Sequence, residues 1–165
     1  MRAAFIAASV AWALLLLAAP FAASRPHASP LASALILGVY GIGSLVCHQL
    51  PERSYHVWTA QMPVCARCAG IYFGAVLGVA VAAVARGFEP SVRRFQPSGW
   101  RSPQRLALRR PRVALALAVV PTLLTLVYEW TTGDMPSHAI RAAAGVPIGV
   151  VVAWLVVAAA DNQVN

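Results

Sequence analysis

Residues 66–85, ARCAGIYFGAVLGVAVAAVA, are the stretch that decides the fold. Arg67 is its only charged residue, and about 18 apolar residues are enough to cross a hydrocarbon core of about 30 Å as an α-helix. Gly70, Gly74 and Gly78 recur at every fourth position, so they share one side of such a helix and permit close approach of a neighbour. The stretch therefore predicts a membrane-spanning helix with a packing seam.

Similar apolar runs lie on both sides of this stretch, at residues 4–23, 31–50, 113–132 and 142–160. The chain of 165 residues is 59% hydrophobic and only 11% charged. We therefore expect an all-α fold, in which residues 1–165 form a single polytopic domain of about five transmembrane helices in a lipid bilayer. Residues 1–24 also fit a signal peptide, and its cleavage would leave four spans. Gly145 and Gly149 repeat the small-residue spacing in the last run.

Basic residues concentrate in one connection, residues 86–112, which holds eight of the 13 arginines. Arginine enrichment between spans marks the cytoplasmic side, so this basic loop accounts for the net charge of +8 without a nucleic-acid partner. Contacts with anionic lipid and with protein partners in the membrane are compatible with it. A multi-pass protein of the cell membrane is expected, with residues 51–64 and the N-terminus extracytoplasmic and the C-terminus cytoplasmic.

All three cysteines lie within residues 47–68, at the facing ends of two predicted helices. The two strings are Cys47-His48-Gln49 and Pro63-Val64-Cys65-Ala66-Arg67-Cys68. Three thiolates and one imidazole suit a tetrahedral transition metal, zinc first, with Cys47, Cys65 and Cys68 as ligands. Either His48 or His56 would be the fourth, and His48 fits only if the second helix has ended before it. Pro63 suits the first turn of the third helix.

Other uses of these residues remain open. Cys65 and Cys68 could cycle between dithiol and disulfide, with Cys47 exchanging, as in a membrane thiol-disulfide oxidoreductase. The start of a helix and the neighbouring Arg67 both favour the thiolate. A third reading is a scaffold without catalysis, in which the cysteines join two helices. Covalent haem is disfavoured because Ala69, not histidine, follows the pair.

Polar residues near the start of the last span reach the same predicted membrane face. They are Glu129, Asp134, His138 and Arg141. They could join the cysteine site, although their roles are not fixed by any motif. The sequence has no Ser-His-Asp order, phosphate-binding glycine loop or paired carboxylates, which argues against hydrolases and nucleotide-dependent enzymes.

The two cysteine strings also carry a family resemblance. The pattern CHQxPxRSY at residues 47–55, followed by PVCARCAGIYxG at residues 63–74, resembles the membrane-protein family called domain of unknown function 2085. Residues 35–80 resemble it closely, and the tail Arg141-x-x-x-Gly145-x-x-x-Gly149 resembles it more loosely. Ala69 and Tyr55 stand where the family usually has threonine and phenylalanine. The resemblance implies a small multi-span protein with a shared cysteine site and names no reaction.

Overall fold

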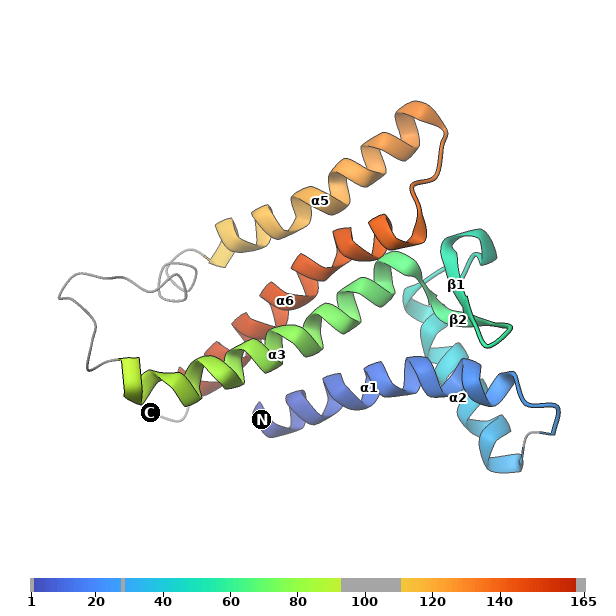
Figure 1. The fold of residues 1–165 in the computed structure, drawn as a ribbon, viewed down its shortest axis with the longest axis horizontal. Helices are drawn as coiled ribbons and strands as arrows, with labels where there is room; N and C mark the ends of the chain where they lie inside the picture. The colour runs from blue at the N-terminus through green and yellow to red at the C-terminus, as the bar shows by residue number, and fades with distance from the viewer. Residues whose placement is uncertain (1, 28, 93–110, 163–165) are drawn as a thin grey trace.

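The computed structural model describes residues 2–27, 29–92 and 111–162, and these form a helical bundle with one short hairpin (Figure 1). The helices are α1 (Arg2–Ala23), α2 (Pro30–Val46), α3 (Ala66–Val92), α5 (Pro111–Thr132) and α6 (His138–Asn162). The expected all-α membrane bundle is confirmed. Most of the predicted basic loop, residues 93–110, lies outside the described residues.

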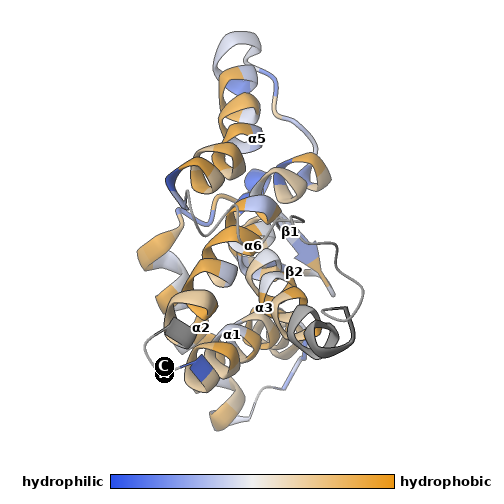
Figure 2. Ribbon diagram, turned by 90° about the vertical axis from the view of Figure 1, so that its left-hand side faces the viewer, coloured by the Kyte–Doolittle hydropathy of each residue, from blue (hydrophilic) through white to orange (hydrophobic). Residues whose placement is uncertain are grey.

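Four of these helices are long and apolar enough to cross a bilayer, namely α1, α3, α5 and α6. Apolar residues cover most of their length (Figure 2). Many of these side chains face outward, such as Leu117 and Leu124 of α5, which are 66% and 65% exposed. In water such a surface would be unfavourable, so we assign it to contact with lipid acyl chains.

The packing seam predicted from the glycines joins α3 to α6. A Cβ atom added at Gly70, Gly74 or Gly78 would collide with the backbone of α6 at Ala142, Val146 or Val150. The reciprocal contact comes from Gly145 and Gly149, which face the α3 backbone at Arg67 and Ile71. Two helix backbones can approach this closely only where the residues between them are as small as glycine. Such close packing holds the helices together, since apolar burial drives little association inside lipid. The seam fixes the positions of the first turns of α3 and α6 relative to each other.

The second apolar run differs from the expected span over residues 31–50. Its helix, α2, has 17 residues and ends at Val46, because Cys47 is already extended, with φ −147° and ψ 138°. At about 1.5 Å per residue such a helix falls short of a 30 Å core. Figure 1 shows α2 crossing the end of the bundle steeply instead of running alongside α1 and α3.

The expectation of an N-terminus on the cysteine side is wrong in this structure. The start of α1 packs beside the later turns of α3 and α6, at the end of the bundle away from the hairpin (Figure 1). The α2 helix, the hairpin and the α5–α6 connection lie at the other end. The reason is that four long helices, an even number, traverse the bundle while α2 stays at the far end. An alternation of five spans does not describe the chain.

A two-stranded hairpin takes the place of the predicted loop between the second and third helices. A 3-10 turn, η1 (Pro51–Arg53), leads into β1 (Ser54–Val57), which pairs antiparallel with β2 (Ala60–Cys65). The two residues between the strands, Trp58 and Thr59, have φ angles of 51° and 72°. Both angles fit a primed hairpin turn, which usually contains asparagine or glycine. The turn lacks its usual sequence signal, so the pattern did not predict it.

Candidate metal centre

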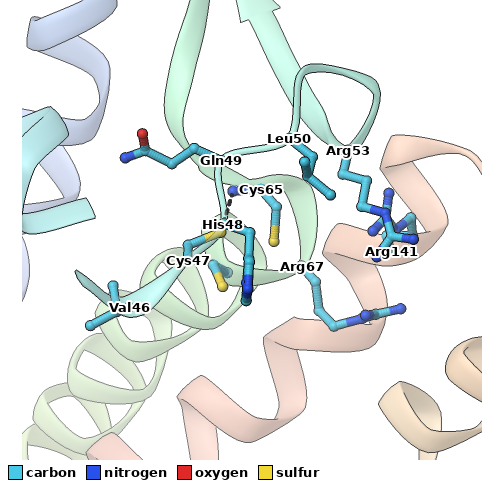
Figure 3. A pocket seen from close by; sticks show the side chains of 10 residues that line it. Val46, Cys47, His48, Gln49, Leu50, Arg53, Cys65, Arg67 and Arg141 are labelled. Carbon is cyan, nitrogen blue, oxygen red and sulfur yellow. Dashed lines mark hydrogen bonds between the residues drawn. The ribbon is translucent and has the colours of Figure 1, made fainter. Parts of the chain in front are cut away.

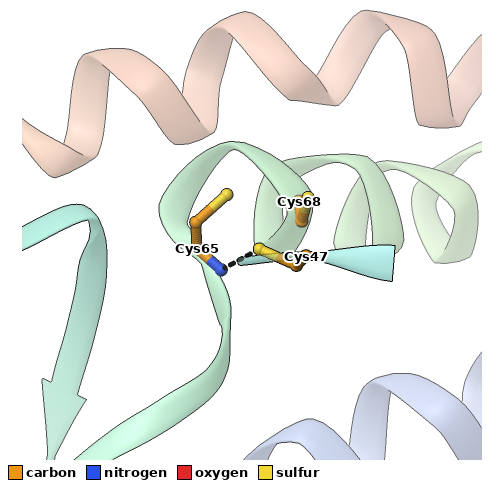
Figure 4. A group of neighbouring side chains, drawn as sticks. All are labelled: Cys47, Cys65 and Cys68. Carbon is orange, nitrogen blue, oxygen red and sulfur yellow. Dashed lines mark hydrogen bonds between the residues drawn. The ribbon is translucent and has the colours of Figure 1, made fainter. Parts of the chain in front are cut away.

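The sulfur atoms of Cys47, Cys65 and Cys68 converge, as expected from their positions at facing helix ends. All three lie within 4.8 Å of one another (Figure 4). Three thiolates bound to one tetrahedral zinc ion at about 2.3 Å would be about 3.8 Å apart. The observed cluster is within about 1 Å of that arrangement, a distance that small side-chain rotations can close.

Each cysteine sits on a different element. Cys47 directly follows the last residue of α2, Cys65 is the last residue of β2, and Cys68 lies in the first turn of α3. Pro63 lies inside β2 and not in the first helical turn, which corrects the sequence-based expectation. The strand brings Cys65 to the cluster in extended backbone, so its side chain and that of Cys68 approach Cys47 from two elements.

Gln49 ties the end of α2 to β2. Its Nε2 donates hydrogen bonds to the backbone carbonyls of Tyr40, at 2.8 Å, and Pro63, at 2.7 Å. Gln61 in turn donates through Nε2 to the carbonyl of Gln49, and Tyr40 donates through its hydroxyl to the carbonyl of Gln61. Gly43 permits this contact, since a Cβ there would collide with the Pro63 carbonyl. This network of side-chain bonds sets the distance between Cys47 and Cys65.

The environment of the cluster favours a thiolate at Cys65. The pKa of Cys65 is lowered to about 5, chiefly by a hydrogen bond from the Cys68 thiol and further by Cys47 and the backbone N–H groups of Cys68 and Arg67. Burial opposes this shift. The Cys65 backbone N–H also donates to the Cys47 sulfur at 3.2 Å. The backbone donors at the start of α3 contribute to this shift, but the Cys68 thiol contributes more.

A pocket of about 360 Å³ opens beside the three sulfurs (Figure 3). His48 lines it, so this candidate fourth ligand lies in the same site. The set of ligand atoms within 4.8 Å of one another comprises the three cysteines, without His48 or His56. His56 is exposed on β1, where it pairs with Gln61. The helix does end before His48, which was the geometric condition for its use as a ligand.

A buried ionic cluster borders the pocket. Glu129 of α5 lies 3.1 Å from both the Arg67 Nη2 atom of α3 and the Arg141 Nε atom of α6. Arg67 donates hydrogen bonds to Glu129 and to Thr125 of α5, each at 3.1 Å. Arg141 and Glu129 form an ion pair without a hydrogen bond, because the Nε–H group of Arg141 does not point at the carboxylate. The Arg67 side chain therefore pairs with a carboxylate, so its effect on the thiolates comes through its backbone.

The remaining polar candidates lie apart from the sulfurs. Asp134 is exposed in the α5–α6 connection. His138 packs against the Tyr55 ring, with 5.4 Å between ring centroids. Of the four residues near the start of α6 that were considered, Arg141 lines the pocket and Glu129 neutralises part of its charge.

The comparisons with known proteins agree with this architecture. Residues 47–155 match a family described as a predicted membrane protein (DUF2085), and the matched region begins at Cys47, the first cysteine of the cluster. The chain belongs to this family. It is also 38% identical over 63 residues to the uncharacterized protein MJ1492 of Methanocaldococcus jannaschii, an alignment that covers 38% of this chain and 40% of that relative. No solved structure matches the chain.

Three contributors to the site had no signal that identified their role. Arg53 lines the pocket although the sequence places it in a polar turn after the cysteine-histidine string. Gln49 acts through backbone carbonyls, which no pattern of side chains shows. Gly43 is explained by its close approach to β2. The family pattern CHQxPxR includes Gln49 and Arg53 without stating what they do, and Gly43 lies outside it.

Proposed function

We propose that Cys47, Cys65 and Cys68 hold a transition metal at one face of the membrane, with zinc as the first candidate ion. The observation that carries the proposal is the mutual approach of three sulfurs from two chain segments to within 4.8 Å. Thiolates from separate segments would otherwise have little reason to meet at one point, and such ligand sets suit zinc or other thiophilic ions. Metal bound here would join α2, the hairpin and α3.

His48 is the proposed fourth ligand. It follows Cys47 directly, lies on non-helical backbone and lines the same pocket. A rotation of its side chain is needed, because it is not within the group of mutually close ligand atoms. His56 is the alternative; both imidazoles are exposed, but His56 lies on β1 and does not line the pocket.

A thiol-disulfide oxidoreductase is the second candidate. The favouring observation is the contact among three reduced thiols, one of which has its pKa lowered to about 5. Attack by a thiolate on a disulfide requires such an ionised sulfur. A redox pair needs only two of the cysteines at a time, whereas a metal site uses all three together. The difference can be measured.

The decisive experiment is elemental analysis combined with a thiol count on detergent-purified protein. The proposal expects about one zinc ion per chain, which is lost in Cys68→Ser and in Cys47→Ser. His48→Ala should weaken binding, and His56→Ala serves as the matched control. Cobalt substitution adds a readout, since thiolate-to-cobalt absorption reports sulfur ligands directly. Metal-free protein with a reducible Cys65–Cys68 bond would instead establish the redox function, and a protein with neither would leave a scaffold.

We further propose that the cysteine end faces the extracytoplasmic side, with both chain ends cytoplasmic. This orientation places the arginine-rich residues 86–112 on the cytoplasmic side, as the positive-inside rule requires. A membrane-impermeant maleimide applied to intact cells should label Glu52→Cys near the hairpin. Ala3→Cys, at the opposite end of α1, should react only after the membrane is opened. The reverse pattern would invert the topology.

A further inference from the structure

We infer that the pocket beside the cysteines binds an oxyanion, of the phosphate or carboxylate class, through Arg53, Arg67 and Arg141. The three arginines come from η1, α3 and α6, so the fold gathers them from separate parts of the chain. Figure 3 shows their side chains extending into one side of the pocket. This inference stands on the arginines and does not require a bound metal.

The arginines carry donors that the protein does not satisfy. The Nε atoms of Arg53, Arg67 and Arg141 are buried and make no hydrogen bond. Arg141 is only 1% exposed, although it lines the pocket. A guanidinium is ionised under all physiological conditions, and a buried donor without a partner is costly. Arg67 and Arg141 share one carboxylate, and the Arg53 side chain has no partner among the described residues, so the three charges are incompletely compensated.

The net charge of the side chains around the pocket also favours binding of an anion. Glu129 is the carboxylate that pairs with Arg67 and Arg141. Glu52 and Asp134, also at this end, are exposed and have no ion pair with the arginines in the described part of the chain. Three guanidinium groups against one carboxylate leave two positive charges, and a divalent ion held by three thiolates would offset one of them. At least one positive charge therefore remains, in a site of low dielectric where it attracts an anion strongly.

The ligand chemistry follows from the donors. Planar guanidinium forks match the spacing of two oxygens on a phosphate or carboxylate. A pocket of about 360 Å³ has room for such a group with a small substituent. The oxyanion has two possible sources, a free solute or the headgroup of an anionic lipid. Both present the same oxygens to the arginines.

The test uses full-length protein in detergent, stripped of lipid and treated with a chelator. Equilibrium dialysis with labelled inorganic phosphate, together with thermal unfolding, measures the free anion. Nanodiscs containing phosphatidic acid, against phosphatidylcholine alone, measure the lipid headgroup. We expect binding of at least one of these probes at one site per chain, with a rise in the unfolding temperature.

Arg53→Gln is the informative variant, because the Arg53 side chain makes no hydrogen bond or ion pair within the described residues and its loss should leave the fold intact. Binding should fall about ten-fold or more, as expected for a charge-assisted hydrogen bond. Arg53→Lys should recover part of it. Arg25→Gln is the matched control, since Arg25 is exposed and packs over the Phe21 ring.

The outcomes separate this proposal from the metal site. Binding of either probe that survives in Cys68→Ser and depends on Arg53 supports the oxyanion site, whether or not metal is found. Failure of both probes, or equal binding by Arg53→Gln and Arg25→Gln, overturns it. Absence of zinc from the wild-type protein, with oxyanion binding retained, would refute only the proposed metal centre.

Discussion

Replacing Gly74 by alanine should loosen the seam that holds α3 against α6. The added Cβ would lie 2.9 Å from the Val146 Cα and 3.1 Å from the Val146 carbonyl carbon, and closer still to the carbonyl oxygen. Ordinary carbon contacts lie at about 3.5–4.0 Å, so the helices must separate by about 0.5–1 Å. The backbone cannot yield as a flexible side chain would.

The expected cost combines two opposing terms. Overpacking of this kind destabilises by about 1–3 kcal/mol. Replacing glycine by alanine inside a helix returns about 0.8–1 kcal/mol, which leaves a net loss of about 0–2 kcal/mol for Gly74→Ala. Gly41 of α2 has nothing within 4 Å of its added Cβ. Gly41→Ala should therefore be neutral or slightly stabilising, and the two variants should differ by the overpacking cost, about 1–3 kcal/mol.

Unfolding in mixed micelles of dodecyl maltoside and increasing sodium dodecyl sulfate, followed by circular dichroism, measures this difference. Since α3 carries Cys68 and α6 carries Arg141, metal content and oxyanion binding should decline with stability in Gly74→Ala. If Gly74→Ala is as stable as Gly41→Ala, the α3–α6 seam is not as close as the structure shows, and the reasoning fails.

Three further predictions concern the site. Glu129→Gln should destabilise the protein by about 3–5 kcal/mol, because it leaves two buried arginines without their carboxylate, while exposed Glu52→Gln should change thermal stability little. In metal-free protein, the rate at which iodoacetamide alkylates Cys65 should show an inflection near pH 5. The reactivity should persist at about pH 6–7 and be lost only as the pH falls through that inflection. An inflection near about pH 8.5 would contradict this prediction. Gln49→Ala should weaken metal binding about ten-fold or more, since it removes the two bonds that hold α2 against β2; unchanged affinity would show that the cluster forms without them.

The helices were predictable because lipid imposes a simple rule on sequence. A backbone in hydrocarbon must satisfy its own hydrogen bonds, so long apolar runs become helices. A packing face on each of α3 and α6 was also visible from the four-residue spacing of their glycines, and the structure shows that the two faces pack against each other. The apolar run at residues 31–50 was predicted to be a full span because hydropathy measures composition only. Its helix ends at Val46, since the backbone is extended at Cys47.

By itself, the sequence determined that the chain is a helical membrane protein and that its three cysteines stand at facing element ends. Both follow from local properties, the length of apolar runs and the positions of sulfur along the chain. Only the tertiary structure decided that Arg53, Arg67 and Arg141 share a pocket with those sulfurs and that Glu129 neutralises part of their charge. These residues are up to 88 positions apart in the chain, from 53 to 141. Packing of α5 on α6 and of α6 on α3, and the hairpin that carries Cys65, bring them together. Which helices pair, and the hairpin itself, have no local signature.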